Sequence, residues 1–202
     1  MAVPTEQSDK SELNDQDGAF PSLKDHLLVA MPGLGDPFFK ESVTYVIQHD
    51  EEGAMGVMIN QPMPFTHEEL LEQLGLESEG ENLKQDVLSG GPVQIQRGFV
   101  LHRPLGDWES TLPINDTVAL TTSLDILEAI ANNDGPTDYQ MLLGYAGWDA
   151  GQLDREMLEN SWLTVPANEE ILFEIPIEER WQKASQLIGV DINQLTLLAG
   201  HS

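Results

Sequence analysis

Residues 141–153, with the sequence MLLGYAGWDAGQL, constrain the fold more than any other part of the chain. The apolar run at the start leads into a segment with three closely spaced glycines and then into polar, helix-forming residues. That order is typical of a buried strand that turns into a helix, because glycine permits positive φ angles and close backbone approaches. Tyr145 and Trp148 lie between the glycines, where they either form the floor of a pocket or belong to the core. No residue order in this stretch specifies a reaction.

The net charge of −26, from 35 acidic and 9 basic residues, limits the partners that the chain can bind. A nucleic-acid-binding surface needs clustered Lys and Arg to displace counterions from phosphates. The basic residues here are scattered, apart from a local patch at Arg97 and Arg103. Direct binding to nucleic acid or to an anionic membrane is therefore disfavoured. The simplest interpretation of the acidity is a strongly solvated surface.

The absence of cysteine excludes disulfides, thiolate nucleophiles and cysteine-based zinc sites. The N-terminus lacks the basic and apolar regions of a signal peptide, and no apolar run reaches the length of about 18 residues that suggests a membrane span. We therefore expect a cytoplasmic protein without a membrane segment. A length of 202 residues with 40% apolar residues suits one domain with a sizeable core.

The pattern along the chain predicts a disordered acidic tail over residues 1–22 and a single domain over residues 23–202. Thr66 and Glu69 have the spacing of a helix capping box, and Ser123 is expected to cap a later helix. Residues 76–85 are expected to form an exposed loop. Strands are expected over residues 26–31, 43–48, 54–60, 98–102, 118–121, 138–146 and 171–175, and helices over residues 67–74, 124–132, 152–160 and 178–188.

The connections between these elements indicate the fold class. The strands at 43–48 and 54–60 are separated by five residues of turn chemistry, so they should form an antiparallel hairpin. Other strands are separated by single helices. Hairpins mixed with helical crossovers predict an α+β fold with a mixed or mostly antiparallel sheet and flanking helices.

Three segments together resemble the YqgE/AlgH family of bacterial proteins: residues 27–62 (LLVAMPGLGDPFFKESVTYVIQHDEEGAMGVMINQP), 89–102 (SGGPVQIQRGFVLH) and 143–163 (LGYAGWDAGQLDREMLENSWL). The resemblance covers roughly residues 23–190 and implies a compact single-domain α+β fold with a sheet curled towards a barrel. Some members of the family are labelled transcriptional regulators. The resemblance supplies no established catalytic residues, and the acidity of this chain argues against a version of that role that contacts DNA directly.

His49 and His102 are the candidate general bases, since each ends an expected strand. A histidine at such a position is more often a hydrogen-bonded structural residue. No HxxxH or HExxH spacing supports a metal site, and the single GxG at residues 33–35 lacks the third glycine of a dinucleotide fingerprint. The sequence therefore predicts neither a metal nor a cofactor.

A glycine-rich segment is the best candidate for ligand binding. Gly90, Gly91, Gln94 and Arg97 bring backbone amides, a carboxamide and a guanidinium together, a combination that can hold a carboxylate or phosphate. The alternative is a plain glycine-rich connection in which Arg97 pairs with one of the many acids. The remaining candidates are polar or aromatic residues within apolar or glycine-rich motifs, and each polar one is equally typical of a turn or a helix cap: Asp36, Asn60, Tyr145, Trp148, Gln152 and Asp154.

Three functional hypotheses follow. The first is a binding or regulatory module that holds a small anionic ligand or a partner protein in a pocket lined by residues 32–37, 89–98 and 145–152. The second is an enzyme of unassigned class with His49 or His102 as general base and Arg97 as anion holder. The third is a transcriptional regulator, which the charge restricts to an indirect mode of action. We favour the first.

Overall fold

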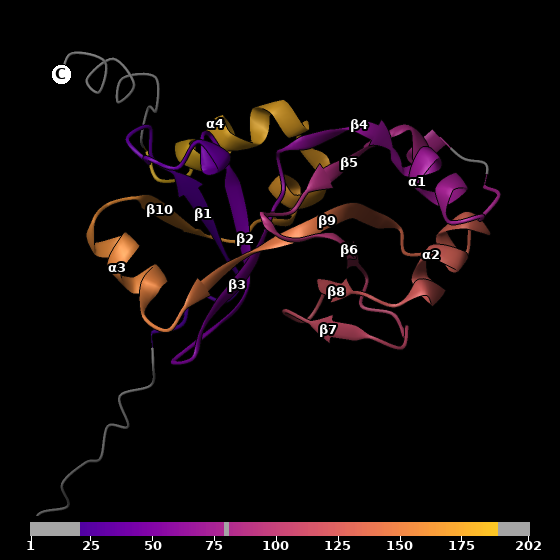
Figure 1. The fold of residues 1–202 in the computed structure, drawn as a ribbon, viewed down its shortest axis with the longest axis horizontal. Helices are drawn as coiled ribbons and strands as arrows, with labels where there is room; N and C mark the ends of the chain where they lie inside the picture. Colours follow the sequence, from indigo (N-terminus) through magenta and orange to yellow (C-terminus); the bar gives the residue numbers. More distant parts are fainter. Residues whose placement is uncertain (1–20, 79–80, 190–202) are drawn as a thin grey trace, which may run out of the picture.

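The computed structural model describes residues 21–78 and 81–189, which form one α+β domain around a curled sheet (Figure 1). The expected tail over residues 1–22 lies outside these ranges except for its last two residues, and the expected domain is described only as far as Gly189. No helix in the described residues is both long and apolar enough to cross a bilayer.

Ten strands of the described chain form the sheet, in the order β10-β1-β2-β3-β9-β6-β8-β7, and β5 joins β4 to β9 beside this path. All strand pairs of the described residues are antiparallel except the parallel pair of β5 and β9, in agreement with the α+β prediction. The strands are β1 (His26–Ala30), β2 (Val43–Asp50), β3 (Gly53–Met58), β4 (Pro62–Thr66), β5 (Asp86–Ser89), β6 (Val93–Arg103), β7 (Thr111–Pro113), β8 (Ala119–Thr121), β9 (Asp138–Asp149) and β10 (Trp162–Pro166).

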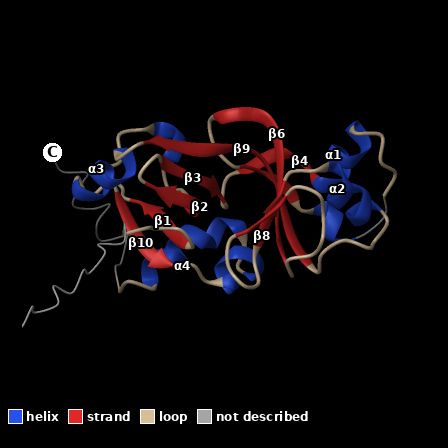
Figure 2. Cartoon of the chain, turned by 90° about the horizontal axis from the view of Figure 1, so that it is seen from below, coloured by secondary structure: helices blue, strands red, loops and turns tan. Residues whose placement is uncertain are grey.

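The helices lie around the sheet, with α3 at one end and α1 and α2 together at the other (Figures 1 and 2). The α-helices are α1 (His67–Gln73), α2 (Leu124–Ala131), α3 (Gln152–Leu158) and α4 (Arg180–Gln186). Short helical turns are η1 (Pro37–Phe39), η2 (Glu81–Lys84), the π-helical turn η3 (Glu170–Glu174) and η4 (Ile177–Glu179).

Several local predictions are confirmed. The hairpin of β2 and β3 is antiparallel, with Asp50 opposite Gly53. The capping box at the start of α1 is complete, because the Thr66 hydroxyl accepts from the Glu69 amide and the Glu69 carboxylate accepts from the Thr66 amide. These are signals that a local sequence pattern can carry, since both partners lie within a few residues of each other.

Other local predictions are wrong. Residues 171–175 are not a strand, because Asn168 starts a helical turn by accepting from the Glu170 amide through its side chain and from the Leu172 amide through its carbonyl. Ser123 precedes α2 but makes no capping bond, since its hydroxyl donates to Asp125, which itself accepts from the Ile126 amide. Part of the exposed loop predicted at residues 76–85 is η2, in which Leu83 is buried. Residues 79–80 of that loop lie outside the described chain.

The chain crosses over β9 between β5 and β6. Leu142 and Leu143 of β9 pair with β5 along one edge and with β6 along the other, so residues 90–92 must pass from one side of β9 to the other. The crossing lies over Gly144 and Tyr145, and glycines make it possible. A Cβ on Gly90 would lie 2.3 Å from the Gly144 oxygen, and one on Gly91 would lie 2.0 Å from the carbonyl carbon of Tyr145.

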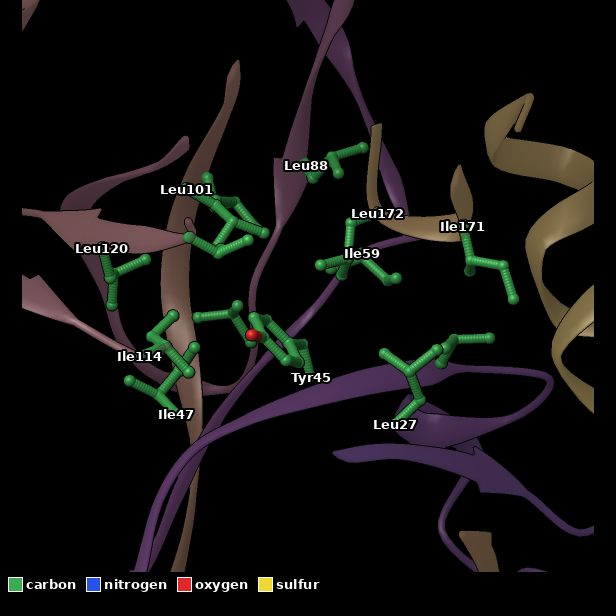
Figure 3. Close-up of a cluster of buried hydrophobic side chains, with 14 of the residues drawn as sticks. Leu27, Tyr45, Ile47, Ile59, Leu88, Leu101, Ile114, Leu120, Ile171 and Leu172 are labelled. Atoms are coloured by element: carbon green, nitrogen blue, oxygen red, sulfur yellow. The ribbon is translucent and has the colours of Figure 1, made fainter. Parts of the chain in front are cut away.

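Two faces of the sheet carry separate cores. The inner face of the curl holds the largest cluster, including Leu27, Tyr45, Leu101 and Leu142, and the turn η3 and helix α4 close over it (Figure 3). On the outer face, one cluster lies beneath α1 and α2 and a second lies beneath α3. The positive φ of +73° at Gly144 accompanies a change of phase in β9, after which Tyr145 faces inward and Trp148 outward.

Candidate functional site

Five of the sequence-predicted residues come together where the chain crosses β9. Gly90, Gly91, Gln94 and Arg97 belong to the crossing or to the first half of β6, and Tyr145 lies directly beneath it. The Gly90 amide donates to the Leu143 carbonyl over 2.8 Å. That amide is therefore already used within the fold, and the glycines serve the close approach of two backbones.

Gln94 and Arg97 form the polar part of this region. The Arg97 guanidinium donates to the Gln94 carboxamide oxygen over 3.3 Å and lies 5.4 Å from the centre of the Phe99 ring. Phe99 in turn meets the Tyr145 ring edge to face, with 6.0 Å between the ring centres. Arg97 is exposed and forms no ion pair with any carboxylate of the described residues.

Trp148, Gln152 and Asp36 belong to a different part of the molecule. Trp148 packs beneath α3 with its indole N–H donating to Glu156 over 2.9 Å, and Glu156 also accepts from Gln152 over 2.9 Å. Asp36 is exposed and caps η1 by accepting from the Phe38 amide. Because Tyr145 and Trp148 lie on opposite faces of β9, the two aromatic side chains do not share one pocket floor.

Asn60 lies in a third place, at a mixed polar cavity of about 390 Å³ beside Trp181. Its side-chain oxygen accepts from the Val43 amide over 2.7 Å, and its nitrogen donates to the Glu41 carbonyl over 2.8 Å. Both ends of the carboxamide thus hold the turn before β2. Glu41, Asp86 and Glu178 bring three carboxylates to the same cavity.

His102 is fully buried, and both ring nitrogens are engaged. Nδ1 lies 2.9 Å from the Pro104 carbonyl and Nε2 lies 2.8 Å from the Thr121 hydroxyl. Because a carbonyl can only accept, Nδ1 carries the proton and Nε2 accepts from Thr121. Burial lowers the pKa of His102, and the bond to Pro104 opposes that shift.

His49 is also a buried ring at a strand end. Its Nδ1 accepts from the Leu23 amide over 3.0 Å, and its Nε2 lies 3.6 Å from the Asp154 carboxylate. Neither histidine lines the cavity at Asn60 or the groove described next. Within the described chain, no group of three or more His, Asp or Glu side chains is arranged to hold a metal ion.

An apolar groove of about 250 Å³ lies between α1 and α2, over the paired strands β6 and β9. Leu70 of α1 and Leu74, which directly follows α1, form one wall, and Leu124 and Leu127 of α2 form the other. Leu74 is 49% exposed and Leu124 is 52% exposed. The sequence predicted both helices, but the groove between them depends on tertiary packing and was not predicted.

The charge around the groove differs from that of the whole chain. Residues 87–106, which include all of β6, contain no Asp or Glu. Among the described residues that line the groove, Arg97 is the only charged one, and the outward-facing side chains of Val100, Met141 and Leu143 form the floor. The Arg97 guanidinium itself lies over the inward-facing ring of Phe99, so the groove presents an apolar surface, which suits an apolar partner.

Comparison with known proteins places the chain among related bacterial sequences. The AlgH-like family model matches residues 27–193. A UPF0301 protein of Saccharophagus degradans is 52% identical over 185 residues, which are 92% of this chain and 91% of that protein. A UPF0301 protein of Thioalkalivibrio sulfidiphilus is 49% identical over 181 residues, with 90% and 97% covered.

Solved structures share the fold. The solution structure of the AlgH protein from Pseudomonas aeruginosa has a TM-score of 0.73 and 43% sequence identity, and the match covers 98% of this chain and all of that one. A crystal structure of a Corynebacterium diphtheriae protein has a TM-score of 0.68 at 16% identity, over 85% of this chain and 90% of the other. The latter likeness concerns the fold alone.

Proposed function

From the premise that this chain belongs to the AlgH-like family, we propose that it is a binding module that holds an apolar segment of a partner protein in the groove between α1 and α2. The observation that carries the proposal is the pair of leucine walls, in which Leu74 and Leu124 stay half exposed above an apolar floor. Contiguous apolar surface of this kind is typical of protein interaction sites. Helix-in-groove docking is a common way of filling it.

The energetics favour a partner that covers both walls. Complete burial of a leucine side chain contributes about 1.5–3 kcal/mol relative to full exposure. Leu74 and Leu124 have about half of that contribution still to gain, and Leu70 and Leu127 extend the same two walls. A segment of a partner protein laid along the groove would cover both walls at once.

The enzyme hypothesis has less support from the geometry. His102 has no exposed surface and two engaged nitrogens, and the His49 side chain is 2% exposed. A general base must reach the proton that it abstracts, directly or through one water. Either ring would need local opening of the fold before it could meet a substrate. Partner binding also accommodates an indirect regulatory role, in which the chain acts on transcription through another protein.

A peptide-binding experiment tests the proposal. The probe is a short fluorescent peptide with leucines at helical i, i+3, i+4, i+7 spacing and uncharged glutamines elsewhere, and its anisotropy is measured against the full chain. We expect Leu74→Lys and Leu124→Lys to weaken binding at least about tenfold, a loss of about 1.4 kcal/mol.

Leu158→Lys is the matched control, since Leu158 is 84% exposed at the end of α3 and the substitution adds the same charge away from the groove. Equal binding by the control and by both groove variants would overturn the proposal. So would the absence of binding by the unmodified chain to this peptide.

A further inference from the structure

We propose that a small polar cavity at the start of β9 binds a potassium ion, with Gln140 and Asp138 among its ligands. The cavity has a volume of about 50 Å³ and is lined by the first residues of β9, by Phe173 of η3 and by Gln85, which directly precedes β5. It shares no residue with the groove between α1 and α2. The inference is therefore independent of the proposed function.

The first step is the side-chain oxygen of Gln140. Gln140 is 4% exposed, and its side-chain nitrogen lies 3.5 Å from the side-chain oxygen of Gln85. The oxygen of Gln140 is buried and has no hydrogen-bond partner among the described residues. Buried polar atoms in native proteins nearly always have a partner. We therefore expect this oxygen to find its partner within the cavity that Gln140 lines.

The second step is the sign of the charge that the cavity favours. Asp138 lines the cavity, and none of its described lining residues is Lys, Arg or His. The Asp138 carboxylate accepts from Arg103, which also pairs with Glu169 and Glu174. Three carboxylates against one guanidinium leave an excess of negative charge beside the cavity. The site therefore favours a cation over an anion.

The third step is the kind of cation. One water molecule needs about 10–15 Å³ and organic ligands occupy pockets of at least about 300 Å³, so this cavity suits an ion with a few waters. Asp138 is the only acid among the described lining residues, whereas Ca²⁺ affinity depends on the number of charged ligands. Neutral carbonyl oxygens can replace the hydration shell of K⁺. Gln140, Gln85 and Thr137 bring neutral oxygens to this cavity.

The test compares three chloride salts that differ only in the cation. The midpoint of thermal unfolding of the full chain is measured in KCl, NaCl and choline chloride, each at about 200 mM, so that all three screen surface charge equally. A ligand that binds only the folded state raises the midpoint. We expect the midpoint in KCl to exceed that in the other two salts by at least about 2 °C.

Four variants locate the effect. Gln140→Met and Asp138→Asn each remove one ligand, and both should lose the difference between KCl and NaCl. Each variant is compared with itself in the two salts, so a change in its overall stability does not affect the result. Gln48→Met and Asp149→Asn are the matched controls and should keep the difference. Gln48 is an exposed carboxamide on β2 that donates to Asp50, and Asp149 is an exposed acid at the other end of β9.

A second measurement reports on the cavity directly. The side-chain amide signals of Gln140 and Gln85 are followed by NMR while K⁺ replaces Na⁺ at constant ionic strength, and we expect saturable shifts at both. Equal midpoints in KCl and NaCl, or signals that do not move, would overturn the proposal and leave the cavity to water. A KCl effect that persists in both Gln140→Met and Asp138→Asn would place the cation elsewhere and would overturn it as well.

Discussion

At the scale of single residues, glycines decide where two parts of the backbone can touch. Gly90, Gly91 and Gly144 lie where the chain crosses β9, and a Cβ on any of them would meet backbone atoms within 2.4 Å. Backbone atoms cannot move aside as the tip of a flexible side chain can. Gly91 also has a φ of +155°, which side chains of L-residues rarely adopt. These glycines are a requirement of the fold.

We expect Gly91→Ala to lower the free energy of unfolding by more than about 3 kcal/mol, because the clash with Tyr145 adds to the backbone strain. Urea denaturation measures the loss. Gly33→Ala is the control, since its Cβ would meet no atom within 4 Å, and it should change stability by less than about 0.5 kcal/mol. Similar losses of unfolding free energy for the two variants would contradict the close backbone approach at the crossing.

The candidate site residues were partly predictable at this scale. Gly90, Gly91, Gln94 and Arg97 are close in the sequence, so their proximity follows from chain connectivity. Trp148 was expected near Tyr145, on the assumption that the glycines end the strand. Instead, β9 continues through them to Asp149. Because side chains alternate along a strand, the two rings then lie on opposite faces. A glycine that serves a crossing and a glycine that ends a strand look alike in the sequence.

At the scale of elements, His102 joins β6 to β8 through its bond to Thr121. Its pKa in the folded chain is lowered by burial, whereas in the unfolded chain it is about 6.5. The unfolded state therefore binds the proton first as the pH falls. The stability that the fold gains from keeping His102 neutral is therefore fully present above about pH 6.5, and it is lost as the pH drops from there towards the pKa of the folded state.

We expect the stability advantage of the unmodified chain over His102→Gln to shrink as the pH falls from about 7.5 to about 5, because the neutral glutamine has no proton to gain. The free energies of unfolding in urea, compared at each pH, measure this difference. Carboxylates titrate in both proteins, so their effect cancels in the comparison. A difference that is constant with pH would show that His102 does not titrate differently in the two states.

Elements held by distant partners were the ones that the sequence pattern missed. The residues of η3 have the composition of a strand, yet Arg103 of β6 binds Glu169, just before the turn, and Glu174, its last residue, and its guanidinium lies over the ring of Phe173. Strand β4 contains two prolines, which argue against a strand in the sequence, but it pairs with the short β5. The four α-helices of the described chain were all predicted, although only α1 has a side-chain cap.

At the scale of the whole molecule, the net charge of −26 acts on stability as well as on partner choice. Like charges on a compact chain repel one another, and unfolding relieves that repulsion. We expect the midpoint of thermal unfolding to rise by at least about 3 °C when NaCl is raised from about 20 mM to about 300 mM, since salt screens the repulsion. Choline chloride should act equally, and an unchanged or lower midpoint in both salts would contradict this account.

The crossing of the chain over β9 has a consequence for the order in which the molecule forms. Strands β5 and β6 are neighbours in the sequence but not in the sheet, because β9 lies between them, and β9 begins 35 residues after β6 ends. During synthesis β5 and β6 therefore leave the ribosome with their facing edges unpaired. Both strands can pair fully only after β9 has been synthesised, and β9 must then insert beneath residues 90–92. Closure of the sheet is thus a long-range event, and such events set the slow limit of folding rates.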